Sequence, residues 1–112
     1  MKTKADDILV EESSGNVFAD LGLPDPEERL AKADLAIAIG REIDSRGLTQ
    51  AEAAELLGVA QPDISNLVRG RLSGYSIERL TRLLNSLGQD VEIRIRPTGA
   101  GKERGHLRVA VG

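Results

Sequence analysis

The sequence LTQAEAAELLGVAQPDISNLVRG, residues 48–70, is the most informative part of this chain. Thr49 and Glu52 have the spacing of a capping box, in which each side chain bonds the backbone of the other residue, so a helix is expected to begin here. Gly58 suits the left-handed position that ends a helix, because it lacks a Cβ. A second helix can begin with Pro62 in its first turn and end before the next glycine. The stretch therefore predicts two short helices joined by a tight turn.

Helical patterns on both sides of this stretch bring the prediction to four helices. Upstream, apolar residues recur at every fourth position between Pro26 and Gly47, and acidic residues occupy the first turn, where the helix dipole favours them. Downstream, Ser76 can cap a further helix that ends before Gly88. The apolar residues expected in the core are Leu35, Ile39, Ile43, Ile64, Leu67, Val68, Ile77, Leu80, Leu83, Leu84 and Leu87.

The period of the apolar residues changes to two beyond Gly88. Residues 91–96 alternate apolar and charged side chains, which is typical of a half-buried strand, and Pro97 ends the run. A second alternating run, residues 107–111, lies beyond a flexible linker and can pair with the first as a hairpin. Because a lone strand or hairpin is marginal in water, the strand needs a partner edge, which a second copy of the chain can supply. The residues expected at that dimer contact are Val91, Ile93 and Ile95.

The predicted fold is mainly α-helical, a bundle of four to five helices with a short C-terminal β-strand that can extend to a hairpin. Two short helices joined through a glycine turn form a helix-turn-helix, whose second helix enters the major groove of DNA. We expect an acidic N-terminal partner-binding arm at residues 1–25, a helix-turn-helix DNA-binding domain at 26–89, and a strand with a basic tail at 90–112.

Charge is divided unevenly along the chain. The formal net charge is −3, which by itself does not suggest a nucleic-acid partner. Residues 1–28, however, hold two lysines and eight carboxylates, a net charge of −6, so the remainder carries +3. From residue 61 onward nine basic side chains face five acidic ones. The basic half is therefore the part suited to phosphate.

The composition argues against metal sites and catalysis. The chain has no cysteine and one histidine, His106, which lies among glycines and charges and is expected to be solvated. No glycine-rich phosphate loop follows a strand, and no nucleophile can pair with a histidine base. We expect no metal, no cofactor and no enzymatic activity. With no apolar leader and no apolar run of membrane-spanning length, a cytoplasmic protein is expected.

The 48–70 stretch resembles the XRE/Cro family of repressor domains. The positions that carry the resemblance are Leu48, Thr49, Gln50, Ala54, Leu57, Gly58, Val59, Gln61, Pro62, Ile64, Ser65, Leu67 and Gly70. The resemblance implies a Cro/repressor-like helix-turn-helix bundle that binds double-stranded operator DNA as a homodimer. Ala60 departs from the family, which usually has Ser or Thr at this helix cap. The absence of a capping hydroxyl should cost about 1 kcal/mol of helix stability.

The flanking segments are similar to HigA-type antitoxins. The similar positions are residues 15–23, Glu28, Lys32, Leu87, Gly88 and residues 90–94. This resemblance implies a repressor of its own operon that also binds and neutralises a small basic toxin, a ribonuclease of the RelE/HigB-like class. The alternative is a stand-alone XRE-type transcriptional repressor without a toxin partner.

The residues expected to read bases lie in the second helix of the motif. Gln61 begins that helix, and a glutamine can pair bidentately with adenine in the major groove. Ser65 and Asn66, one turn further on, can reach base edges or a phosphate. Asp63 is either an acceptor for cytosine or a charge that favours the helix dipole, and Pro62 shares this first turn.

Phosphate contacts are expected around the motif. Gln50 begins the first helix of the motif, where backbone N–H groups can also meet a phosphate. Arg69 and Arg71 are the expected phosphate clamps. Tyr75 can donate its hydroxyl to a phosphate or pack over the loop before the last helix.

The acidic N-terminal segment can be a solubiliser, a segment that packs on the helical core, or an arm that binds the basic toxin. Its expected toxin-binding residues are the apolar Val17, Phe18, Leu21 and Leu23. If the arm does not bind, the toxin contact is expected on the outer face of the first long helix, around Arg29, Lys32 and Ala36.

Overall fold

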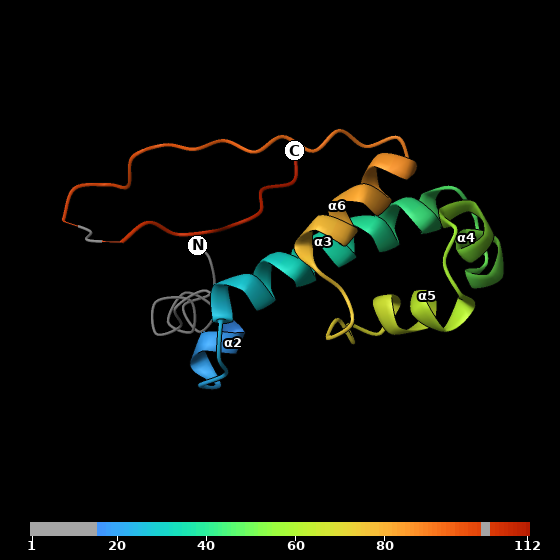
Figure 1. Ribbon diagram of the computed structural model, residues 1–112, viewed down its shortest axis with the longest axis horizontal. Helices are drawn as coiled ribbons and strands as arrows, with labels where there is room; N and C mark the ends of the chain where they lie inside the picture. Colours follow the sequence, from blue (N-terminus) through green and yellow to red (C-terminus); the bar gives the residue numbers. More distant parts are fainter. Residues whose placement is uncertain (1–15, 102–103) are drawn as a thin grey trace, which may run out of the picture.

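The computed structural model describes residues 16–101 and 104–112, and in these residues it contains five helices and no β-strand (Figure 1). The helices are α2 (Val17–Asp20), α3 (Pro26–Ser45), α4 (Gln50–Leu57), α5 (Gln61–Val68) and α6 (Ile77–Ser86). The predicted helical fold is confirmed, and the four expected helices are α3 to α6. The single turn of α2 adds a fifth. No helix in the described part of the chain is long and apolar enough to span a membrane.

The long helix α3 is the scaffold of the domain. Its C-terminal half packs against α6 and α5, and its N-terminal end packs against α2 (Figure 1). The most deeply buried side chains come from three of these helices and the residue after α6. They are Ile39, Ile64, Leu67, Leu80 and Leu87. The core therefore fixes α5 against α3 and α6, as the apolar spacing predicts.

One expected core residue is on the surface. Val68, the last residue of α5, is 45% exposed, so the prediction that it is buried was wrong. Its neighbour Leu67 fills the inward position, and consecutive residues of a helix point about 100° apart.

The ends of α4 follow the expected local interactions. The hydroxyl of Thr49 accepts a hydrogen bond from Glu52 N at 3.1 Å, and Glu52 Oε1 accepts one from Thr49 N at 2.9 Å. Gly58 follows α4 with φ of 71°, in the left-handed region. The helix α5, by contrast, begins after Ala60 without a side-chain cap, as its sequence predicts.

The predicted C-terminal β-strand is absent from the described residues of the single chain. The prediction of a hairpin between residues 91–96 and 107–111 of one chain was wrong. After α6 the chain runs out and back as two extended segments (Figure 1). In the described residues, no backbone hydrogen bond joins residues 91–96 to residues 107–111. A strand exists only as part of a ladder, and this chain alone offers residues 91–96 no second edge. The side chains expected to be half-buried are correspondingly exposed: Val91 37%, Ile93 82% and Ile95 94%.

Candidate nucleic-acid interface

The turn between α4 and α5 holds the two helices at a close crossing. Gly58 N donates to Glu55 O at 3.3 Å, and Val59 N donates to Ala54 O at 3.0 Å, which closes the end of α4. Ala53 and Ala54 are buried and small, so α5 can approach the α4 backbone closely. The orientation of α5 is therefore fixed by packing and by backbone hydrogen bonds together.

The first turn of α5 presents polar side chains to solvent. Ile64 and Leu67 hold the inner face in the core, with 0% and 2% of their surfaces exposed. Gln61 and Asn66 are exposed, and Ser65 is partly exposed. Pro62 is exposed as well. Helix α5 thus has one face in the core and one face available to a groove of DNA, which is the arrangement the sequence predicts.

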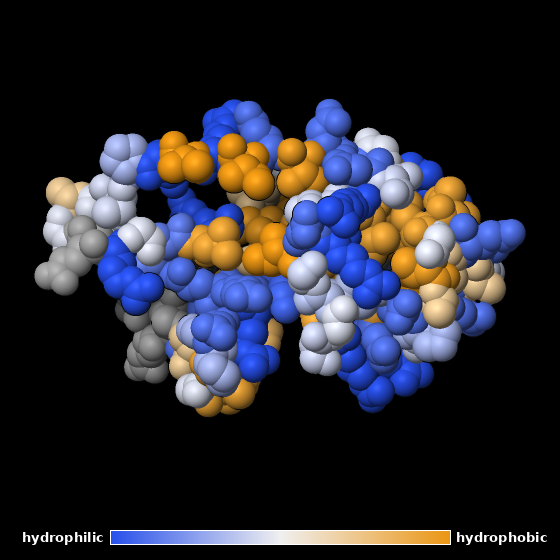
Figure 2. Space-filling view, viewed as in Figure 1, coloured by the Kyte–Doolittle hydropathy of each residue, from blue (hydrophilic) through white to orange (hydrophobic). Residues whose placement is uncertain are grey.

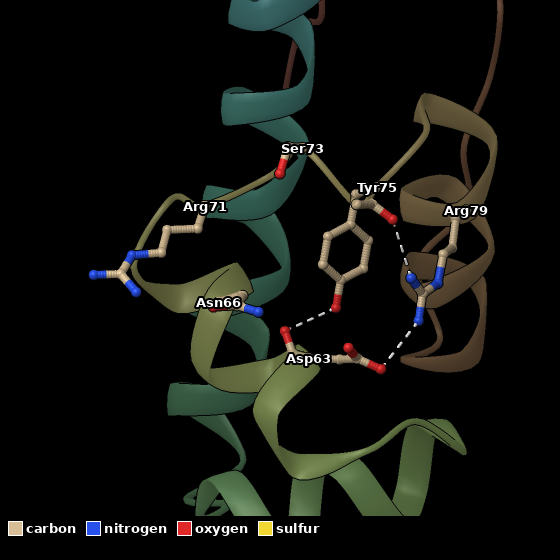
Figure 3. Close-up of a pocket in the computed structure, with 7 residues that line it drawn as sticks. Asp63, Asn66, Arg71, Ser73, Tyr75 and Arg79 are labelled. Atoms are coloured by element: carbon tan, nitrogen blue, oxygen red, sulfur yellow. Dashed lines mark hydrogen bonds and ion pairs between the residues drawn. The ribbon is translucent and has the colours of Figure 1, made fainter.

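Asp63 is tied to the domain rather than left free. Arg79 Nη2 lies 3.4 Å from Asp63 Oδ2, and the Tyr75 hydroxyl donates to the backbone carbonyl of Asp63 at 2.9 Å (Figure 3). The guanidinium of Arg79 stacks over the Tyr75 ring, 4.5 Å from its centroid. These contacts favour a structural role for the Asp63 carboxylate over the acceptance of a cytosine amino group.

Tyr75 packs in the core, and its hydroxyl is not available to a phosphate. The side chain is 4% exposed. Burial raises the pKa of Tyr75, and the positive charge of Arg79 opposes this effect. The hydroxyl therefore stays protonated and keeps its donor role at neutral pH. Sequence reasoning does not single out Arg79, although its spacing of four residues from Tyr75 is the one signal present.

A shallow polar pocket of about 270 Å³ opens beside α5. The lining residues of this pocket are Asp63, Asn66, Arg71, Ser73, Gly74, Tyr75 and Arg79. The Arg71 side chain extends away from Tyr75 and Arg79, so the guanidiniums of Arg71 and Arg79 lie on different sides of the pocket (Figure 3).

The expected phosphate clamps lie just beyond α5. Gly70, with φ of 77°, closes the helix, and Arg71 N donates to Asn66 O at 2.8 Å. Arg69 and Arg71 are both exposed on either side of this glycine. Gln50 is exposed at the start of α4. These three side chains are accessible to a ligand and have no role in the core.

The residues expected to bind a toxin lie at the other end of α3 from the helix-turn-helix (Figure 1). Val17, Leu21 and Leu23 are 56%, 69% and 37% exposed, and Phe18 is partly buried. Asn16 caps α2 and donates from Nδ2 to Pro26 O at 2.8 Å, which links this segment to the start of α3. The rest of the expected arm, residues 1–15, lies outside the described residues.

The alternative toxin surface on α3 needs a correction. Ala36 is 6% exposed and belongs to the core, so it cannot belong to an outer face. Ala36 lies next to Leu35 in a helix buried over a wide arc, where a small residue can face inward.

The sequence around His106 predicts a solvated side chain, but in the structure this side chain contacts Glu27. Its Nδ1 lies 2.6 Å from Glu27 Oε2, while Leu107 N donates to Glu27 Oε1 at 3.1 Å. These two contacts, the histidine contact first, lower the pKa of Glu27. Within the part of the chain that the structure describes, no three side chains of His, Cys, Asp or Glu form a group that could hold a metal ion.

Comparisons with known proteins agree with this geometry. A family model described as a helix-turn-helix domain matches residues 17–96. A solved structure described as that of an XRE-family transcriptional regulator is 45% identical, with a TM-score of 0.74, over 80% of this chain and 100% of that one. No curated protein gives a significant match. The chain therefore belongs to the helix-turn-helix family, as an XRE-like transcriptional regulator.

Proposed function

We propose that this protein is an antitoxin, which represses its own operon as a dimer and neutralises a small basic ribonuclease toxin of the RelE/HigB-like class. In this proposal residues 1–25 form the toxin-binding arm, residues 26–89 the DNA-binding domain and residues 90–112 the dimer contact and a basic tail. The observation that carries the DNA-binding part is the exposed polar face of α5 on a helix whose other face is fully buried.

On operator DNA, α5 enters the major groove with Gln61 leading, where its amide can pair with the N6 and N7 atoms of adenine. Ser65 and Asn66 follow one turn later. Arg69, Arg71 and Gln50 bind phosphates on the two sides of the groove, which sets the register of the domain on the duplex. A dimer repeats these contacts at a second half-site about 34 Å away, or at a multiple of that distance.

Neutralisation of a toxin is supported by the position and composition of the N-terminal segment. A net charge of −6 in residues 1–28 would repel DNA phosphates but complements the basic surface with which a ribonuclease holds RNA. The exposed Val17, Leu21 and Leu23 supply apolar contacts, each of which can contribute about 1.5–3 kcal/mol if fully buried by a partner. They lie far along α3 from α5, so one molecule can hold toxin and DNA together.

A stand-alone repressor is the second candidate, and one observation favours it. The Asn16 to Pro26 hydrogen bond and the contact of α2 with α3 indicate that residues 16–23 already pack on their own domain. In that case the segment is a structural part of the regulator and no toxin is required.

Co-expression with the product of the adjacent gene, followed by co-purification and an RNA-cleavage assay, tests the proposal. Removal of residues 1–25 should abolish inhibition of cleavage and leave operator binding within a few-fold of the parent. The shortened chain is expected to fold, because α2 has no buried residue. If the shortened chain folds and still inhibits the toxin, the arm is not the interface.

A point substitution gives a sharper comparison. Leu21→Asp should weaken toxin binding, since it places a charge in the apolar contact. Ile37→Asp is the matched control, because Ile37 is also an exposed apolar side chain, 51% against 69%, but lies on α3 outside the proposed contact. Equal effects of the two substitutions on toxin binding would contradict the proposal.

A further inference from the structure

The extended segment after α6 has unused backbone groups and exposed apolar side chains. In the described residues, no backbone hydrogen bond is made by residues 90–96. Ile93 and Ile95 are among the most exposed large apolar side chains described. Figure 2 shows hydrophobic residues along both extended C-terminal segments on one face of the molecule. Such an edge is suited to pairing with a further strand.

The side chains of this segment are sorted between its two faces. Arg94 Nε lies 3.3 Å from Glu92 Oε1, which shows that these two side chains share one side of the extended chain. The alternation of an extended chain assigns the other even-numbered residues to the same side. That side carries, in order, two negative and two positive charges: Asp90, Glu92, Arg94 and Arg96. The odd-numbered side carries only apolar residues: Val91, Ile93 and Ile95.

We propose that residues 90–96 pair antiparallel with the same residues of a second copy, with Ile93 on the two-fold axis. In this register Asp90 lies opposite Arg96 of the other copy and Glu92 lies opposite Arg94. Val91 lies opposite Ile95, and Ile93 lies opposite itself. Every cross-strand pair is then either oppositely charged or apolar, and such pairs stabilise an antiparallel ladder.

Other registers place unfavourable side chains together. A shift that moves the axis to Glu92 or to Arg94 puts that charged residue directly opposite its own copy. An axis between two residues places apolar side chains opposite charged ones, because each single-residue slip exchanges the faces. Only the axis at Ile93 satisfies all seven positions of residues 90–96.

The chain's own C-terminal segment is a poorer occupant of this edge. Residues 107–111 contain one charged side chain, Arg108, which cannot complement two carboxylates and two guanidiniums. The segment is also anchored elsewhere, through the Leu107 N to Glu27 hydrogen bond and through Val109, which packs against the helical core. Residues 90–96 of a second copy supply two carboxylates and two guanidiniums, which in the antiparallel direction lie opposite charges of the other sign.

This inference rests on the dimer in the proposed function, and it adds the register. Cysteine crosslinking reads the register directly, because the chain has no cysteine of its own. Under mild oxidation Ile93→Cys should crosslink to itself, since directly opposite residues lie about 4.5–5.5 Å apart, within the reach of a disulfide. Ile95→Cys should not, because its two copies lie four positions apart, about 13 Å along the ladder. A mixture of Val91→Cys and Ile95→Cys chains should crosslink.

Charge reversal gives an independent test by analytical ultracentrifugation. Glu92→Arg should raise the dimer dissociation constant about tenfold or more, since it creates two like-charged pairs per dimer. Adding Arg94→Glu in the same chain should restore dimerisation, whereas adding Arg96→Glu should not. Restoration by Arg96→Glu instead, or self-crosslinking of Ile95→Cys that is faster than that of Ile93→Cys, would overturn the register.

Operator binding of the Ile93→Cys chain, measured in parallel under reducing conditions, reports separately on the proposed function. A dimer that binds the operator but crosslinks in another register contradicts only the pairing proposed here. A chain that is monomeric at tens of micromolar contradicts the pairing itself. A chain that dimerises as predicted but binds no operator contradicts the proposed function alone.

Discussion

The hydroxyl of Tyr75 donates a 2.9 Å hydrogen bond to the backbone carbonyl of Asp63, and so joins the loop before α6 to the first turn of α5. The ring is buried, and Arg79 covers its face while reaching the Asp63 carboxylate. The turn of α5 that carries Gln61 is thus held from two sides, by its own core contacts and by α6.

Tyr75→Phe should lower the free energy of unfolding by about 0.5–1.5 kcal/mol, because it removes one partly buried hydrogen bond and keeps the ring. Chemical denaturation measures this change. Ser45→Ala is the matched control, since Ser45 also bonds a backbone carbonyl, Glu42 O at 3.0 Å, but at an exposed position, and should have almost no effect. Equal losses in the two variants would contradict a special role for the Tyr75 contact.

Gln61→Ala should relax the preference for one base pair, at a cost of about 1–3 kcal/mol for the preferred operator and almost nothing for random DNA. Arg69→Ala should weaken binding to all sequences alike and reduce the slope of log affinity against log salt by about one. Fluorescence anisotropy over a salt series measures both. Arg82→Ala removes the same charge from α6, where Arg82 pairs with Glu78, and should leave the slope closer to that of the parent.

If Gln61→Ala and Arg69→Ala both bind operator DNA as the parent does, with the same salt dependence, α5 is not the DNA-reading helix. An equal loss in the Arg82→Ala control would indicate that total charge, and not the position of Arg69, governs binding.

Gly58→Ala should destabilise the domain by about 1–2 kcal/mol, because φ of 71° is strained for a residue with a Cβ. No atom lies within 4 Å of the added Cβ, so the loss reports backbone strain without a steric clash. Gly40→Ala is the control inside α3, with equally open space and a helical φ, and should stabilise the protein by about 0.5–1 kcal/mol. Thermal unfolding of the two variants should therefore shift in opposite directions.

Acid should release the C-terminal segment from α3. The lowered pKa of Glu27 means that its contacts with His106 and Leu107 N favour the ionised carboxylate. Their contribution is therefore present above the ordinary value of 4.5 and is lost as the pH falls through the lower pKa of the folded state. The Leu107 amide resonance should follow this transition in an NMR titration. In Glu27→Gln it should show no such transition in the same acid range, and an unchanged transition there would assign the effect to another group.

Local sequence signals predicted the elements of this protein well. The capping box of Thr49 and Glu52 and the left-handed glycine after α4 depend on neighbours three or four residues away, so the residue types alone specify the geometry. The buried positions of α3 and α6 follow from apolar spacing for the same reason. The comparison with a solved XRE-family regulator agrees with the family resemblance that these residues carry.

Local sequence signals could not predict contacts between residues that are distant in the sequence. The Asp63–Arg79 pair spans 16 residues and the Glu27–His106 pair spans 79, and no sequence pattern indicates either pairing. The alternation of residues 91–96 correctly describes a chain that is extended, but a strand also requires a second edge at hydrogen-bonding distance. Periodicity reports which side chains share a face, whereas burial and pairing depend on what the folded surroundings place against that face. For residues 91–96 the single chain places no backbone partner there.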